Sequence, residues 1–185
     1  LKNLQEKFSS SNMKNCKFVG SDLSGLLLKT NNIDHCDFSG SIIDNSHFHY
    51  SSLNNNQFND CKLKDSEFSG SHIKKCNFNG VDFTGSEFKS SSFLKNSMVN
   101  TVLNRTSFNS VQIADIVFEG KIEDCYFENC WFIRVTFQDV LILNTFFKCR
   151  SLKNIRFINC QTDRMTYEFL KNGKADLSGV ILVNT

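Results

Sequence analysis

Proline is absent from the 185 residues of this chain. Proline lacks a backbone N–H and is confined to the edges and bends of sheets, so its absence is compatible with a backbone whose N–H groups pair in long ladders. No run of 18 apolar residues occurs, and the pattern therefore predicts no membrane span. The formal net charge is only +2, which excludes a strong field of one sign and disfavours nucleic acid as a partner.

Motifs that carry chemistry are missing as well. The chain has no glycine-rich phosphate loop, no GxSxG or HExxH motif and no CxxC pair. It also offers no carboxylate at the inward positions defined below, where general acid–base catalysis would need one. We therefore expect no catalytic residue, no cofactor and no metal ligand within these residues, and we leave open whether a longer parent protein is an enzyme.

Large apolar residues recur at every fifth position from Phe8 onward. The series has 23 consecutive members, ending at Phe118, and all of them are Phe, Leu, Ile or Met. One step then spans four residues, to Ile122, after which the five-residue spacing continues from Phe127 to Phe157. A helix has a period of about 3.6 and a strand a period of 2, so neither accounts for this spacing. A fixed period of this kind indicates a repeat architecture.

Two further positions of the repeat are selective. The residue two places before each large residue is mostly small, commonly Ser or Cys with some Asn and Thr. The position two places after each large residue holds eight of the nine glycines: Gly20, Gly25, Gly40, Gly70, Gly80, Gly85, Gly120 and Gly179.

This arrangement resembles the motif of the pentapeptide-repeat family, A-(D/N)-L-x-x, most closely in segments 21–25 (SDLSG) and 175–179 (ADLSG). The resemblance covers about residues 6–160 and 175–184, with Phe where the family commonly has Leu and with Ser or Cys where it commonly has Ala. It implies an all-β solenoid, a right-handed quadrilateral parallel β-helix with four repeats in each coil. The repeats before residue 160 fill about eight coils, and a short C-terminal helix is expected after them.

Four repeats per coil place residues that are 20 apart on the same side of neighbouring coils. Two opposed sides are then rich in aromatic residues, and the sides between them are mainly aliphatic, which would fill a narrow interior without voids. One aromatic side holds Phe18, Phe38, Phe58, Phe78, Met98 and Phe118, and the other holds Phe8, Leu28, Phe48, Phe68, Phe88 and Phe108. We expect the four-residue step to delete one outer residue and to leave the inner order intact.

Eight cysteines are present, and all but Cys149 fall at the small inward position: Cys16, Cys36, Cys61, Cys76, Cys125, Cys130 and Cys160. They alternate with Ser, Asn and Thr, which favours buried reduced thiols over disulfides or a metal site. A reducing cytosol is the expected environment. The four histidines fall at outward positions or beside turns, where we expect a plain surface role: His35, His47, His49 and His72.

The chain divides into four segments in this interpretation. Residues 1–7 form an N-terminal cap or lead-in, and residues 8–160 form the β-helix. Residues 161–174 form a helix, for which Thr162 or Asp163 can provide the N-cap. Residues 175–185 either resume the repeat or begin the next segment, so two arrangements stay open: a helix inserted into a continuing solenoid, or a last partial coil that leads into another domain.

The outward surface becomes apolar after residue 118. Exposed apolar clusters commonly mark an interface, so we predict that a protein partner or an adjacent domain binds the C-terminal third. Cover by the chain's own C-terminal part is the alternative. The candidate partner-binding residues are Tyr126, Trp131, Ile133, Leu141, Leu143, Phe146 and Ile158, of which Tyr126 and Phe146 are 20 apart and should lie one above the other.

The Phe-centred repeats, rich in Asn, Ser and Lys, also resemble the N-terminal β-helix of bacterial type III secreted effectors of the HECT-like ubiquitin ligase kind. This resemblance implies a non-catalytic module of bacterial origin that binds a partner or substrate, is joined to a catalytic part and is secreted into a host cell. No cysteine here corresponds to the catalytic cysteine of those ligases. The chain begins with Leu rather than Met, which also indicates a piece of a longer protein.

A second hypothesis is a free-standing pentapeptide-repeat protein of the quinolone-resistance type, which binds DNA gyrase as a DNA mimic. The Phe and Cys content of this chain is similar to that of such proteins. Imitating DNA requires a strongly negative surface, because duplex DNA carries about one charge per 1.7 Å. The net charge of +2 therefore disfavours this function.

Overall fold

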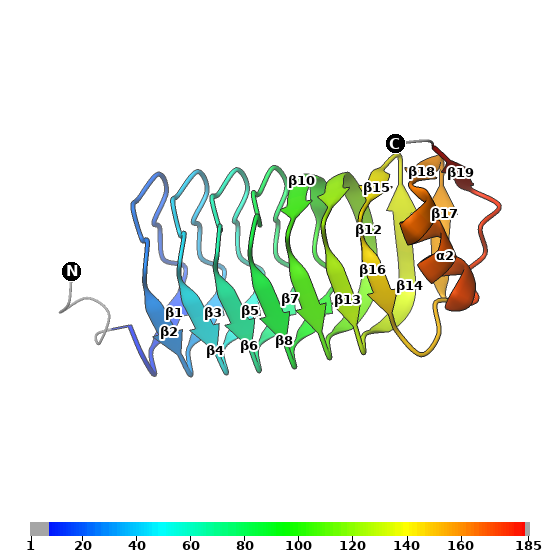
Figure 1. The fold of residues 1–185 in the computed structure, drawn as a ribbon. Coiled ribbons are helices and arrows are strands. Elements are labelled where there is room, and N and C mark those ends of the chain that lie inside the picture. The colour runs from blue at the N-terminus through cyan, green and yellow to red at the C-terminus, as the bar shows by residue number, and fades with distance from the viewer. Residues whose placement is uncertain (1–7, 184–185) are drawn as a thin grey trace.

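The protein is a parallel β-solenoid of about nine turns with one short helix near the C-terminus (Figure 1). The computed structural model describes residues 8–183, so the predicted lead-in, residues 1–7, lies outside the described residues. The predicted fold class is confirmed. The solenoid has about one turn more than the eight coils expected from the repeats, because the chain after the helix pairs once more with the coil before it.

A 12-stranded parallel sheet begins on one side of the solenoid and extends onto other sides in the later coils, where some strands are longer. Residue 33 pairs with residue 13 and with residue 53, which is the expected 20-residue register. The strands along the main path are β1 (Asn12–Lys14), β3 (Asn32–Asp34), β5 (Ser52–Asn54), β7 (His72–Lys74), β9 (Ser92–Leu94), β12 (Gln112–Glu123), β15 (Leu141–Leu143), β18 (Cys160–Thr162) and β19 (Val180–Leu182). Three more strands pair within this sheet: β10 (Met98–Asn104), β14 (Trp131–Gln138) and β17 (Ile155–Ile158).

A second parallel sheet has seven strands and ends at β16. Its members are β2 (Leu27–Lys29), β4 (His47–His49), β6 (Glu67–Ser69), β8 (Glu87–Lys89), β11 (Ser107–Asn109), β13 (Tyr126–Glu128) and β16 (Phe146–Lys148). In the first five coils, the other sides of the solenoid are joined by isolated bridges such as Lys17↔Asp37 and Asp22↔Ile42.

The position two places after each large residue is a left-handed turn. Gly20 has φ 64° and Asn55 has φ 55°, and most repeats show the same conformation. A residue other than glycine is strained in this region by about 1–2 kcal/mol. The turn also places its N–H toward the next coil, where Asn55 N donates to the Lys74 carbonyl at 3.1 Å. The repeated turn is therefore tied into the ladder that joins the coils.

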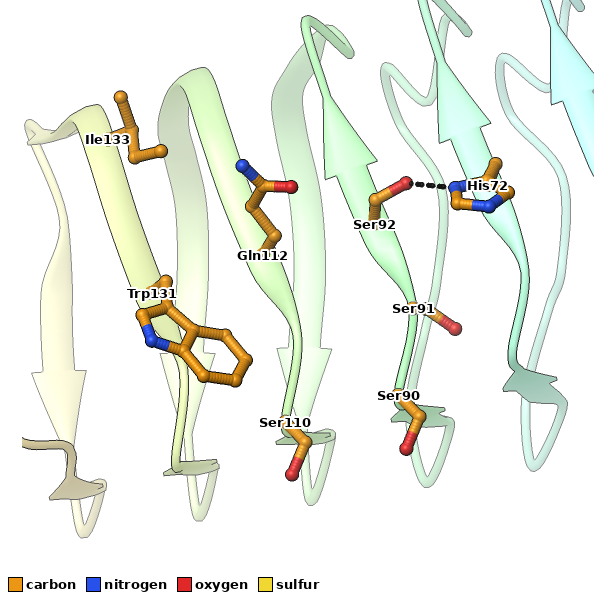
Figure 2. Close-up of a pocket in the computed structure, with 8 residues that line it drawn as sticks. All are labelled: His72, Ser90, Ser91, Ser92, Ser110, Gln112, Trp131 and Ile133. Atoms are coloured by element: carbon orange, nitrogen blue, oxygen red, sulfur yellow. Dashed lines mark hydrogen bonds between the residues drawn. The ribbon is translucent and has the colours of Figure 1, made fainter.

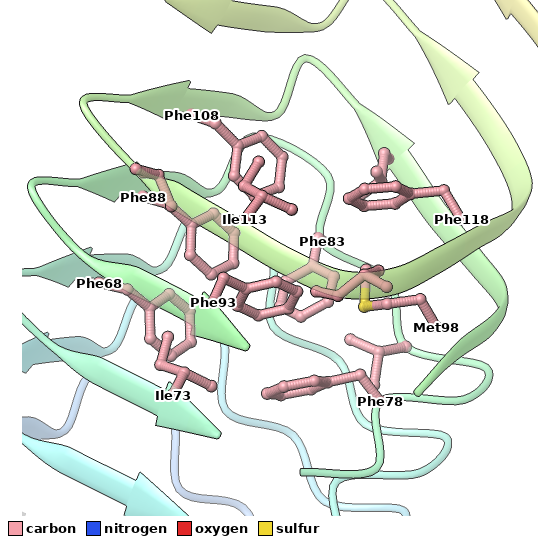
Figure 3. Packing of buried hydrophobic residues seen from close by; sticks show 14 of the residues in the cluster. Phe68, Ile73, Phe78, Phe83, Phe88, Phe93, Met98, Phe108, Ile113 and Phe118 are labelled. Atoms are coloured by element: carbon pink, nitrogen blue, oxygen red, sulfur yellow. The ribbon is translucent and has the colours of Figure 1, made fainter. Parts of the chain in front are cut away.

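The aromatic sides form continuous stacks in the core (Figure 3). Phe48, Phe68, Phe88 and Phe108 follow one another with ring centroids 4.7, 4.7 and 4.6 Å apart and nearly parallel planes. On the opposite side, the rings of Phe38 and Phe58 stack at 4.8 Å. Both predicted stacks are confirmed, and their central members are fully buried.

The small inward residues form a polar ladder beneath the turns. Ser66 Oγ accepts from the Ser46 N–H and donates to the Ile43 carbonyl at 2.9 Å. Cys61 Sγ lies 2.9 Å from the Phe38 carbonyl in the equivalent place. Ser and Cys alternate at this position because both are small and both can donate to the carbonyl 23 residues earlier.

The four-residue step changes the register without disturbing the inner order, as predicted. Met98 pairs with Phe118 and Thr101 pairs with Gly120, so Val99 and Asn100 lie opposite a single residue, Glu119. Pairs that span the step are 19 apart, as Phe108 and Phe127 are. Gly120 stands two places after Phe118 and two places before Ile122, so this one residue is both the turn residue and the small inward residue.

The C-terminal helix α2 (Arg164–Asn172) takes the place of a strand. Asp163 is its N-cap and accepts from the Thr166 N–H at 2.7 Å. Helix α2 contacts β16, the end of the seven-stranded sheet, and Thr166 Oγ1 accepts from the Thr145 N–H at 2.9 Å.

The chain after the helix returns to the 12-stranded sheet, where Val180 pairs with Cys160 in the 20-residue register. The repeat therefore resumes after the helix, which replaces part of a coil of ordinary length, and this strand is compatible with both arrangements left open. Among residues 8–183, no helix is long and apolar enough to cross a membrane.

Candidate functional site

The seven candidate residues do not form one patch. Tyr126 and Phe146 lie on β13 and β16 of the seven-stranded sheet, where their rings stack at 4.6 Å as predicted. Phe169 of helix α2 packs on Phe146 with ring centroids 5.2 Å apart. This part of the predicted surface is therefore partly covered by the chain's own C-terminal helix.

The other five candidates lie on strands of the 12-stranded sheet. Leu141 and Leu143 are on β15, Ile158 is on β17, and Trp131 and Ile133 are on β14. Trp131 and Leu141 are 61% and 43% exposed, whereas the remaining three are half-buried. Trp131 is the most exposed of the seven, and the helix that packs on Phe146 leaves it open to solvent.

An open groove runs along the sheet beside Trp131 (Figure 2). Its volume is about 620 Å³, and its lining residues are His72, Ser90, Ser91, Ser92, Ser110, Gln112, Trp131 and Ile133. The indole ring extends from β14 toward the strand that carries Gln112, and it closes one end of the groove (Figure 2).

The register of the strands explains this composition. His72, Ser92, Gln112 and Trp131 pair in order across β7, β9, β12 and β14, so they form one row of outward side chains. His72 Nδ1 lies 2.8 Å from Ser92 Oγ. The groove therefore offers hydrogen-bonding groups along its length and an aromatic face at its end.

A second row, two residues further along β9, β12 and β14, is apolar. Leu94 pairs with Ala114, and Ala114 pairs with Ile133. Beyond this row, Arg134 donates from Nη2 to Asp115 Oδ2 at 2.9 Å. The Arg134 guanidinium holds the pKa of the Asp115 carboxyl below its ordinary value, so this pair stays charged at neutral pH.

A second hollow lies on the other side of Trp131. Its volume is about 460 Å³, and its lining includes three cations: Arg150, Lys153 and Lys174. No acidic residue lines it, and within residues 8–183 none of the three forms an ion pair within 4 Å. Trp131 thus separates a neutral groove from a basic hollow. Arg150 and Lys153 are close in sequence, whereas the approach of Lys174 to them becomes visible only in the structure.

The eight cysteines are all free thiols, as expected. The expectation that Cys149 lies outside the inward set is wrong. Cys149 Sγ donates to the Phe127 carbonyl at 3.3 Å, which matches the contact of Cys130 Sγ with the Phe108 carbonyl at 3.3 Å. An irregular segment follows β16, and it brings Cys149 to the small inward position one residue earlier than the period predicts.

The thiols should differ in reactivity toward an alkylating reagent at pH 8. Burial raises the pKa of Cys61 and Cys76 to about 12 and that of Cys125 to about 11, whereas a hydrogen bond with Cys130 lowers the pKa of Cys149. Because the thiolate is the reacting form, we expect Cys149 to be modified first. Peptide mass spectrometry over time checks the order, and equal labelling of all eight thiols would contradict the burial described here.

Residues 11–84 match the family model described as pentapeptide repeat region. Full-length QnrB1, a plasmid-mediated fluoroquinolone resistance protein, has a similar structure with a TM-score of 0.55 and 18% identity, over 95% of this chain and 93% of that one. HetL, a pentapeptide repeat protein involved in heterocyst differentiation regulation from the cyanobacterium Nostoc sp. strain PCC 7120, gives a TM-score of 0.54 and 13% identity, over 94% and 83%.

No curated protein matches the chain in sequence. The family-model match is confined to residues 11–84, and the two solved structures share the fold of this chain. Identities of 13–18% show a shared fold only, so the function has to be inferred from the surface of this chain.

Proposed function

We propose that this solenoid is a non-catalytic protein-binding module that holds a segment of a partner protein at Trp131. The partner places an apolar side chain against the indole and against the apolar row that includes Ile133. It places Asp or Glu residues in the basic hollow lined by Arg150, Lys153 and Lys174. The observation that carries the proposal is the position of one 61% exposed Trp between an open groove and three cations that form no ion pair within residues 8–183.

Physical reasons favour a protein segment as the occupant. Trp and Arg are enriched among the residues that dominate the energy of protein interfaces. A stiff solenoid loses little conformational entropy on binding, because its backbone is already fixed by ladders between coils. The groove is open along its length and lined with side-chain hydroxyl and amide groups, which suits an extended peptide better than an enclosed small molecule.

Peptides selected from a displayed random library on the wild-type module test this proposal. We expect them to combine an aromatic or aliphatic residue with neighbouring Asp or Glu, and to bind the Trp131→Ala variant at least about tenfold more weakly. Tyr50→Ala is the matched control, because Tyr50 is 64% exposed and does not line either hollow. Selected peptides that bind both variants as tightly as the wild type would contradict the proposal.

We further propose that the module is the N-terminal partner- or substrate-binding region of a larger bacterial effector of the HECT-like ubiquitin ligase type, which acts in the reducing cytosol of a host cell. The style of the repeats and the eight free thiols support this. The gene sequence that flanks this region tests it directly, since a ligase domain with a catalytic Cys is expected downstream. A flanking sequence without such a domain would contradict the effector assignment and leave the binding site at Trp131 untouched.

Gyrase binding is the second candidate, because the Phe and Cys content of this chain resembles that of quinolone-resistance proteins and QnrB1 shares its fold. The charge opposes it, because the net charge is +2 and the basic hollow carries no acidic residue. A gyrase supercoiling assay in the presence of a quinolone distinguishes the two functions. We expect no protection of the enzyme, and protection would establish the second function in place of the first.

A further inference from the structure

Two histidines and a glutamate meet on neighbouring strands far from the Trp131 groove. His47 and His49 are two residues apart on β4, so both side chains leave the same side of the strand. Glu67 is on β6, and its backbone pairs directly with that of His47. The fold therefore brings together three side chains that are common metal ligands, although the sequence alone assigned both histidines to a plain surface role.

The ligand atoms of this cluster converge on one point. His47 Nδ1 lies 3.4 Å from Glu67 Oε2, and His49 Nε2 lies 3.4 Å from the same oxygen. All three atoms are within 4.8 Å of one another. The centroids of the two imidazole rings are 5.4 Å apart and the ring planes are tilted by 77°, so the rings do not stack on each other.

Both ring nitrogens are shielded from solvent and lack a hydrogen-bond partner among the described residues. Buried polar atoms are nearly always satisfied, so two orphaned nitrogens in one cluster require an explanation. Each lies 3.4 Å from the same carboxylate oxygen, beyond the ordinary hydrogen-bond distance. A cation between the three atoms would satisfy both nitrogens and the carboxylate at once.

We propose that His47, His49 and Glu67 form a binding site for a divalent transition-metal ion such as Zn²⁺. Two ligands placed about 2.05 Å from a tetrahedral zinc ion lie about 3.3 Å apart, which agrees with the two separations of 3.4 Å. Two imidazoles with one carboxylate are a donor set suited to zinc and related metals rather than to calcium or magnesium, which prefer oxygen ligands.

The charges around the cluster leave the required oxygen available. Lys89 Nζ lies 3.9 Å from Glu67 Oε1, which is not the oxygen that contacts the two histidines. Lys89 also forms a closer ion pair with Glu87. Glu67 Oε2 thus remains directed at the imidazoles. The side chain of His47 is 45% exposed, so a fourth coordination position would open to solvent and accept a water molecule.

Titration of the purified module with Co²⁺, followed by displacement with Zn²⁺, tests the site. We expect one Co²⁺ ion per chain, with a visible absorption spectrum of tetrahedral cobalt bound by nitrogen and oxygen ligands, and displacement of Co²⁺ by Zn²⁺. A spectrum with sulfur-to-cobalt charge transfer would instead assign the metal to the free thiols and overturn the proposal.

Single substitutions locate the ligands. His47→Ala, His49→Ala and Glu67→Gln should each lower the Zn²⁺ affinity by at least about tenfold, because each removes one of three ligands. His72→Ala is the matched control, since His72 occupies an outward strand position but hydrogen-bonds to Ser92, and it should leave the affinity unchanged. Circular dichroism checks that each variant is folded. If a His→Ala variant is not folded, the His→Gln substitution at the same position is used in its place.

Two results would overturn the assignment to this cluster. One is the absence of stoichiometric binding by the folded wild-type module. The other is a wild-type affinity in all three ligand variants, or an equal loss in His72→Ala, because either would place the metal elsewhere on the surface.

Discussion

Phe68→Ala is expected to lower the free energy of unfolding by about 3–5 kcal/mol. Phe68 is fully buried, and its ring stacks on Phe48 and on Phe88 with centroids 4.7 Å away on each side. Removing it exposes no new surface to water but leaves a cavity between two rings. The backbone above and below cannot collapse into that cavity, because ladder hydrogen bonds fix the spacing of the coils.

The neighbouring residue provides the control for this prediction. Ser69 follows Phe68 on β6 with its side chain on the outer face, and Ser69→Ala should change the free energy of unfolding by no more than about 0.5 kcal/mol. Urea denaturation of both variants, followed by circular dichroism, makes the comparison. Equal losses in the two variants would show that the inward and outward positions have been assigned incorrectly.

The interior was predictable because one period determines it. Each five-residue repeat supplies one small and one large inward residue, so the large residues alone place Phe48, Phe68 and Phe88 in one stack. The role of the small position was only partly predictable. Size explains why Ser and Cys occur there. The hydrogen bonds that join Ser66 to the backbone of Ser46 and of Ile43 in the previous coil become visible only in the structure.

The surface was less predictable, because its sites are assembled across coils. Trp131 was recognised as an anomaly in a polar surface, but its groove partners His72 and Gln112 are ordinary outward residues in their own repeats. The same applies to Glu67, which meets His47 only through the 20-residue register. A comparison of outward residues at separations of 20, and of 19 across the four-residue step, pairs the members of both sets.

The helix shows a different limit of sequence reasoning. The N-cap candidates correctly indicated a short helix, since Asp163 caps it. Local patterns do not say whether a helix is added to a coil or replaces part of one. The decisive quantity is the 20-residue separation between Cys160 and Val180, which equals one ordinary coil.

The four-residue step depends on a single glycine. Gly120 has φ 119°, outside the left-handed turn region that the other repeats use, and residues with a Cβ essentially never adopt it. A Cβ at this position would also lie 2.3 Å from the Thr101 carbonyl oxygen and 2.9 Å from the Thr101 nitrogen. Both are backbone atoms fixed by the hydrogen bonds between coils, so they cannot move aside as a flexible side chain would.

Gly120→Ala is therefore expected to lower the free energy of unfolding by about 3–5 kcal/mol, from backbone strain together with overpacking. Gly20→Ala is the matched control: Gly20 has φ 64°, and an added Cβ there meets no atom within 4 Å. It should cost only about 1–2 kcal/mol, the ordinary penalty of a left-handed residue with a side chain. Urea denaturation of the two variants measures the difference, and a Gly120→Ala loss no larger than that of Gly20→Ala would mean that the shortened step tolerates a side chain.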